Sequence, residues 1–122
     1  MAINPETQIQ RKIMLALSEA GCTVFRNETS GAWLGKIIHK AGNQVTIANA
    51  HMMVFGLAVG SSDLIGIAPN GKFLAVEVKT ATGRAAKEQR EFIEAVRASG
   101  GIAGIARNEQ DALALISGET ET

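Results

Sequence analysis

Apolar side chains recur with a helical period in three segments of the chain. The first segment opens with Asn-Pro-Glu at residues 4–6. This suits a helix start, because asparagine caps the first turn, proline fits its backbone and glutamate favours the positive end of the helix dipole. Gly21 would end this helix. Two more helices are expected, from Ala85 to Ser99 and from a cap at Asn108 to Ile116. The face of the first helix that we expect to be buried carries Ile9, Ile13, Leu17 and Ala20.

Four strands are expected between these helices. The two clearest are Asp63–Ile67 and Phe73–Thr80, because apolar residues dominate both and the linking residues 68–72 contain the turn dipeptide Asn-Gly. Shorter strands are expected at Thr23–Glu28 and Ile102–Arg107.

A further hairpin is expected to form an arm over residues 31–50. Its strands would be Trp33–His39 and Gln44–Ala48, joined by the turn of residues 40–43. Residues 49–62 contain glycines and small residues, which favour an irregular segment. The element order is then α-β-(hairpin arm)-β-β-α-β-α, which predicts an α/β fold with a mixed β-sheet flanked by helices in three layers.

Length and composition are those of one globular domain over residues 1–122, with residues 118–122 expected to be a disordered tail. The longest apolar stretch is interrupted by glycines and Asp63, so we expect no membrane span. The N-terminus lacks a secretory signal pattern and the single Cys22 cannot form an internal disulfide. These features favour a cytoplasmic protein.

The charge distribution bears on the choice of partner. The chain has 12 Lys and Arg and 12 Asp and Glu, and zero net charge argues at first against nucleic acid. However, residues 24–90 contain eight of the cations and only four of the anions. This basic middle could contact DNA. Because its excess charge is small, we expect one chain to bind DNA weakly and with strong salt dependence, so that two subunits share one DNA.

The residues with the clearest chemical potential are Asp63, Glu77 and Lys79. Glu77 and Lys79 project from the same face of their strand, because side chains alternate. If Asn70 and Gly71 are the central residues of the hairpin, paired positions sum to about 141, which places Asp63 opposite Val78 or Glu77. Two carboxylates and an ammonium would then converge. Such a pair suits Mg²⁺, and a metal-bound water beside a lysine suits phosphodiester hydrolysis.

The same pattern has a structural explanation. Asp63 could cap the start of its strand, while Glu77 and Lys79 form a cross-strand ladder on the surface. An Asp followed at this spacing by Glu-x-Lys also arises by chance. The hairpin between them, on apolar strands, makes coincidence rarer.

Three segments of the sequence resemble the VRR-NUC family of the PD-(D/E)XK nuclease superfamily. They are GSSDLIG at residues 60–66, FLAVEVK at 73–79, and Gly83-Arg84 with QREF at 89–92. The resemblance implies a restriction-endonuclease-like core and a Mg²⁺- or Mn²⁺-dependent DNA endonuclease. One departure is Ser62, which stands where a proline often precedes the aspartate in this family.

The resemblance also implies residue roles. Asp63 and Glu77 would be metal-binding carboxylates and Val78 would supply a backbone carbonyl. The other catalytic positions would be Lys79, Gln89 on the following helix and Glu6 on the first helix. Glu6 could instead serve only the helix dipole, and Gln89 could be a solvated helix residue.

DNA-contacting residues and partners are expected as follows. The resemblance implies structure-selective cutting of branched DNA, such as flaps or four-way junctions. A homodimer would suit that activity, since paired active sites could nick two strands. Two alternatives are a non-catalytic DNA-binding module that keeps the nuclease fold, and a sequence-specific restriction-type enzyme. Of the cations proposed to contact phosphates, Lys87 and Arg90 could instead only solvate their helix, and Arg26 and His39 could be ordinary surface residues. The arm could instead pack against a second subunit. The candidates are Arg26, Lys36, His39, Lys40, Arg84, Lys87 and Arg90.

Overall fold

A computed structural model describes residues 4–118, which form two compact units, residues 28–58 and the remainder. The order of elements is the one that the sequence predicts. The first unit contains α1 (Pro5–Glu19), β1 (Thr23–Arg26), β4 (Leu64–Ile67), β5 (Phe73–Val78), α2 (Lys87–Ala98), β6 (Ile102–Ala106) and α3 (Glu109–Ser117). The second unit contains β2 (Ser30–Ala41) and β3 (Gln44–Phe55).

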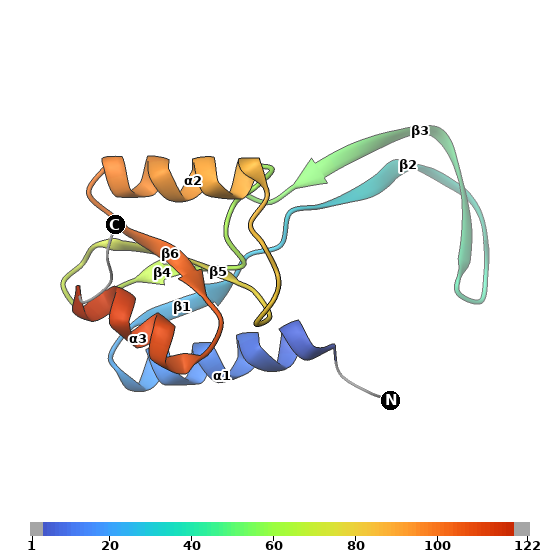
Figure 1. Ribbon diagram of the computed structural model, residues 1–122. Helices are drawn as coiled ribbons and strands as arrows, with labels where there is room; N and C mark the ends of the chain where they lie inside the picture. The colour runs from blue at the N-terminus through green and yellow to red at the C-terminus, as the bar shows by residue number, and fades with distance from the viewer. Residues whose placement is uncertain (1–3, 119–122) are drawn as a thin grey trace. The chain divides into compact units, whose positions relative to one another are not determined.

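The first unit is a mixed sheet between helices. Its strand order is β1-β4-β5-β6, in which only the β5–β6 pair is parallel. Helices α1 and α3 cover one face, while α2 covers the other (Figure 1). This confirms the predicted fold class, an α/β fold with a mixed sheet flanked by helices, and it agrees with a restriction-endonuclease-like core.

Strand β5 lies inside the sheet and is buried on both faces. Leu74, Val76 and Val78 pack in the core that includes α1 and α3. Ala75 packs against α2, and alternation directs Glu77 to that same layer. All five residues are buried, so a carboxylate stands in a position otherwise filled by apolar side chains.

The turn between β4 and β5 differs from the one expected. The Gly71 N–H donates to the Ala68 carbonyl at 2.8 Å and the Ala68 N–H donates to the Lys72 carbonyl at 2.9 Å. The loop therefore has three residues, with Gly71 at φ 87°, as in a turn followed by a glycine bulge. Leu64 pairs with Val76, so the register is shifted by one from the expected sum of 141. Continued by one residue, it sets Asp63 opposite Glu77.

The second unit is a longer hairpin than the expected arm of residues 31–50. Strand β3 continues from Gln44 to Phe55, so the expectation that residues 49–55 are irregular was wrong. The pairs Leu34–His51 and Lys36–Ala48 leave two residues of β3 opposite Gly35, which is a bulge. Asn49, at φ 54°, lies in it. The bulge interrupts the alternation, which is why the pattern of this strand is hidden in the sequence.

The helix ends agree closely with the sequence pattern. Ile13 and Leu17 are buried and Ile9 packs beside them, but Ala20 is exposed because it caps the end of α1. Gly118 ends α3 in a left-handed conformation, and the other residues of the expected tail, 119–122, lie outside the described residues. Within residues 4–118, every helix is too short or too polar to cross a membrane.

Gly66 provides a stability test of the sheet. A Cβ at Gly66 would overlap the Thr23 carbonyl oxygen, because β1 approaches β4 closely there. We expect Gly66→Ala to lower the melting temperature by about 5 to 10 °C, as overpacking does. Gly31→Ala is the comparison, since its Cβ would meet mainly the flexible end of Met52. An unchanged melting temperature for Gly66→Ala would contradict this strand pairing.

Candidate active site

Asp63 is held at the start of β4 by backbone contacts on both sides. Its carbonyl accepts a hydrogen bond from the Asn27 N–H at 2.7 Å, and its Oδ2 accepts one from the Val78 N–H at 2.8 Å. An extended residue directs its N–H and C=O to the same edge of the strand, so the Val78 carbonyl also faces the side on which Asp63 lies. The Asp63 carboxylate is thereby fixed at the end of β5.

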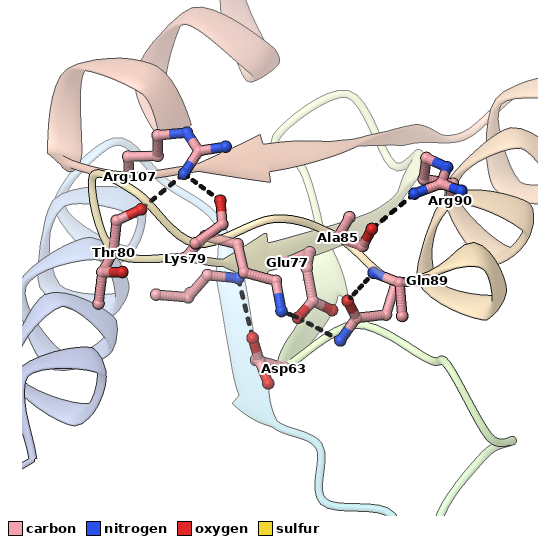
Figure 2. A network of polar contacts seen from close by, with 11 residues as sticks. Asp63, Glu77, Lys79, Thr80, Ala85, Gln89, Arg90 and Arg107 are labelled. Carbon is pink, nitrogen blue, oxygen red and sulfur yellow. Dashed lines mark hydrogen bonds and ion pairs between the residues drawn. The ribbon is translucent and has the colours of Figure 1, made fainter.

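The Glu77 carboxylate lies beside it, almost entirely buried. Its side chain is 2% exposed, and its Oε2 lies 3.0 Å from the Gln89 amide nitrogen, which donates to it, and 3.5 Å from Lys79 Nζ (Figure 2). Its Oε1 is buried without a hydrogen-bond partner. A buried carboxylate oxygen without a donor is costly, so this atom is available to a ligand.

Burial and charge repulsion perturb Glu77. Burial first, and then the neighbouring Asp63 carboxylate, raise the pKa of Glu77 from 4.5 to about 8, while Lys79 acts in the opposite direction. One ammonium therefore does not compensate for two carboxylates at this position. A bound divalent cation would favour the ionised form of Glu77.

Gln89 connects the carboxylate pair to α2. Its Oε1 accepts a hydrogen bond from the Ala86 N–H at 2.8 Å, which satisfies the first turn of the helix. This contact leaves the amide nitrogen directed at Glu77. Gln89 is thus both a helix cap and a donor to the site, rather than a solvated helix residue.

The geometry suits a hard divalent cation held with water. Within residues 4–118, no cluster of three or more His, Cys, Asp and Glu side chains is present, so there is no all-side-chain metal cage. Two carboxylates and one carbonyl are nevertheless the kind of oxygen ligands that Mg²⁺ takes while it keeps several waters. The unpartnered Glu77 Oε1 is the observation that fits such an ion.

The structure brings together part of the predicted set. Asp63, Glu77, Val78, Lys79 and Gln89 meet in one network of polar contacts (Figure 2). Their roles in metal binding and catalysis stay predictions.

Glu6 makes a different contact, at the start of α1. It lies in the first turn of α1, half-buried, and its N–H donates to Asn4 Oδ1 at 2.8 Å. This contact fits the helix-start explanation. The catalytic role suggested for Glu6 stays a prediction.

The predicted DNA-contacting cations are all exposed. Arg90 also donates from Nη1 to the Ala85 carbonyl at 2.6 Å, which ties it to the loop before α2. Arg84 lies in that loop, Lys87 is the first residue of α2, and Arg26 is the last residue of β1. In the arm, Lys36, His39 and Lys40 lie opposite Ala48, Thr46 and Val45.

The sequence pattern did not identify two residues that support the segments on either side of the site. Asn27 donates from its side-chain nitrogen to Ser61 Oγ at 2.8 Å and to the Ser62 carbonyl at 2.9 Å, and so supports the segment before Asp63. Arg107 donates to two carbonyls of the loop after Lys79. Both act largely on backbone atoms, and such contacts leave no motif in the sequence.

Comparison with protein families identifies the class. Residues 4–110 match the VRR-NUC domain, which is most of the chain, so the protein belongs to the VRR-NUC family. Membership implies a nuclease-family, DNA-processing function. No curated protein matches the chain.

The raised pKa of Glu77 predicts how metal-free stability depends on pH. Because the pKa is about 8 in the folded state and near 4.5 when unfolded, the folded state binds the extra proton between these values. Stability from this group is therefore present below pH 4.5 and is lost as the pH rises through 8. We expect the melting temperature in EDTA to fall over this range, and less steeply in Glu77→Gln.

The check is a thermal unfolding series from pH 5 to 8.5. Wild type and Glu77→Gln should differ least at pH 5, with the variant the more stable at pH 8. Parallel curves for the two proteins would show that Glu77 ionises normally.

Proposed function

We propose that this protein is a divalent-metal-dependent DNA endonuclease that hydrolyses phosphodiester bonds. The observation that carries the proposal is the buried Asp63–Glu77 pair with Lys79 beside it, in a chain of the VRR-NUC family. Structural ladders of charged residues lie on surfaces, whereas Glu77 is buried in the sheet with one oxygen unpartnered. That cost is hard to explain by stability alone.

The metal in this proposal is Mg²⁺ or Mn²⁺. The Asp63 and Glu77 carboxylates and the Val78 carbonyl would hold it. Bound there, it would lower the pKa of a coordinated water and stabilise charge on a phosphoryl oxygen.

The protein's own groups have separate tasks in this proposal. Lys79, 15% exposed and 3.5 Å from Glu77 Oε2, reaches the edge of the pair, where its ammonium can stabilise charge that develops on the phosphate. Gln89 fixes the rotamer of Glu77 through its 3.0 Å hydrogen bond. Glu6 would act from α1, as the resemblance implies.

The proposed substrate is branched DNA, such as a flap or a four-way junction, cut in the cytoplasm. The exposed cations Arg26, Arg84, Lys87 and Arg90 would contact phosphates, which carry no base sequence. In the arm, Lys36, His39 and Lys40 would do the same, and residues 29–58 contain no acidic residue. Phosphate contacts of this kind suit selection by shape.

We also propose that the enzyme acts as a homodimer joined through the arm. A two-stranded hairpin is marginally stable alone, and its exposed apolar side chains need cover. Trp33, Val45, Ile47 and Ala50 line a hollow of about 410 Å³ on the hairpin, and Trp33 is 64% exposed. A second copy offers the same apolar surface, which two-fold symmetry can pair with itself.

Cleavage assays test the enzymatic proposal. With Mg²⁺ or Mn²⁺, we expect wild type to cut flap or junction DNA faster than linear duplex, and EDTA to abolish cutting. Asp63→Ala and Lys79→Ala should each slow cleavage by about a hundredfold or more, because each removes charge stabilisation at the reacting phosphate.

Glu94→Gln is the matched control, because Glu94 is an exposed carboxylate on α2 that pairs with Arg97. It should cut at the wild-type rate. Wild type that binds these DNAs with either metal but cleaves none would favour the non-catalytic DNA-binding module. Equal cutting of linear duplex at one sequence would favour a restriction-type enzyme.

The dimer is tested by charge at the arm. Ile37 is 59% exposed and pairs with Ile47. We expect wild type to have twice the mass of one chain by light scattering, and Ile37→Asp to be monomeric because the interface would bury a charge. Leu15→Asp, on the exposed side of α1, should stay dimeric. A monomeric wild type at micromolar concentration would refute the dimer.

A further inference from the structure

Lys79 is the first residue after the end of strand β5. Strand β5 ends at Val78, and the last ladder contact is the Lys79 N–H, which donates to the Ala106 carbonyl at 3.1 Å. Residues 79–86 then form no helix or strand before α2. A turn occurs within them, in which the Gly83 N–H donates to the Thr80 carbonyl at 3.2 Å. The catalytic lysine proposed above therefore depends on a loop.

Arg107 clamps that loop from the end of β6. Its Nη1 donates to the Thr80 carbonyl and to the Gly83 carbonyl, each at 2.6 Å (Figure 2). Hydrogen bonds from a charged donor are stronger than neutral ones, and one guanidinium here closes both ends of the turn. The backbone N–H of Arg107 donates to Asp111 Oδ2 at 2.9 Å, which fixes the base of the side chain at the start of α3.

The clamped turn lies close to the Lys79 side chain. A Cβ built on Gly83 would be 3.5 Å from Lys79 Cδ, which is ordinary van der Waals contact. Gly83 is thus a near neighbour of the lysine stem, and the same stem ends 3.5 Å from Glu77. Moving the turn would leave the stem free to rotate away from the carboxylate pair.

We propose that Arg107 is a positioning residue for Lys79, which holds the Thr80–Gly83 turn so that the ammonium stays beside Glu77. This role rests on the nuclease function proposed above. Arg107 acts through backbone carbonyls, and the proposal gives it no contact with DNA or metal.

The test measures single-turnover cleavage and DNA affinity separately. Because small displacements of a catalytic group are expensive, we expect Arg107→Ala to slow the cleavage step by about tenfold to a hundredfold, with DNA affinity unchanged within about twofold. Arg107→Lys, which keeps a charged donor, should recover part of the rate. Arg97→Ala is the matched control, because Arg97 also donates to a carbonyl of β6, that of Ala103 at 2.9 Å. It should cleave normally.

A double-mutant cycle shows whether the effect passes through Lys79. In a Lys79→Ala background, Arg107→Ala should cause no further loss, since the group it positions is absent. An equal loss in both backgrounds overturns the proposal. So does a loss that appears only in DNA affinity, because that would make Arg107 a phosphate contact.

Hydrogen exchange gives a readout independent of cleavage. Peptides covering residues 79–86 should exchange faster in Arg107→Ala, while those covering β5 should not. Unchanged exchange in the turn refutes the clamp, and if Arg107→Ala does not fold, Arg107→Lys takes its place in both measurements. Wild type without any cleavage refutes the proposed function itself, whereas normal wild-type cleavage with additive losses refutes only the role of Arg107.

Discussion

The burial of the Glu77 carboxylate beside Asp63 is the constraint on which the rest of the site depends. Strand β5 has a neighbour on each side and helices on each face, so the Glu77 side chain is only 2% exposed. The Gln89 amide and the Lys79 ammonium contact Glu77, the Val78 N–H donates to Asp63, and Glu77 Oε1 is left without a hydrogen-bond partner. Burial and the Asp63 carboxylate raise the pKa of Glu77 to about 8, so the pair carries excess negative charge only when Glu77 is ionised, the form that a bound cation would favour.

The positions of the chemical groups follow mostly from strand pairing. The β4–β5 register sets Asp63 opposite Glu77, and the Val78 N–H holds the Asp63 carboxylate there. The β5–β6 pair carries the backbone as far as Lys79. Strand pairing fixes the backbone of the strands but not the loops beyond them. Side-chain contacts must therefore hold the remaining groups in place. Gln89 does so for Glu77, and Arg107 does so for the turn after Lys79.

Local patterns in the sequence were enough for the order of elements and for the central residues of the site. The register was predicted only to within one position, with Asp63 opposite Val78 or Glu77, because Asn70-Gly71 suggested a two-residue turn where the chain makes a three-residue loop. The predicted site does not depend on this difference, since either register puts Asp63 near Glu77. The length of the arm was hidden by the bulge at Asn49. Arg107 could not have been found, because its partners are carbonyl groups, which every residue has.

Charge now explains how a chain of zero net charge can act on DNA. When Glu77 is ionised, the carboxylate pair repels phosphate, and the single ammonium of Lys79 offsets only part of that repulsion. In the proposed enzyme a divalent cation would remove the repulsion, so metal and DNA should each raise the affinity for the other, as linkage requires. Exposed cations such as Arg26, Arg84 and Lys87 can also attract the DNA backbone. In the proposed enzyme the acidic centre would therefore not oppose a nucleic-acid partner; it would make DNA binding at the centre conditional on the metal.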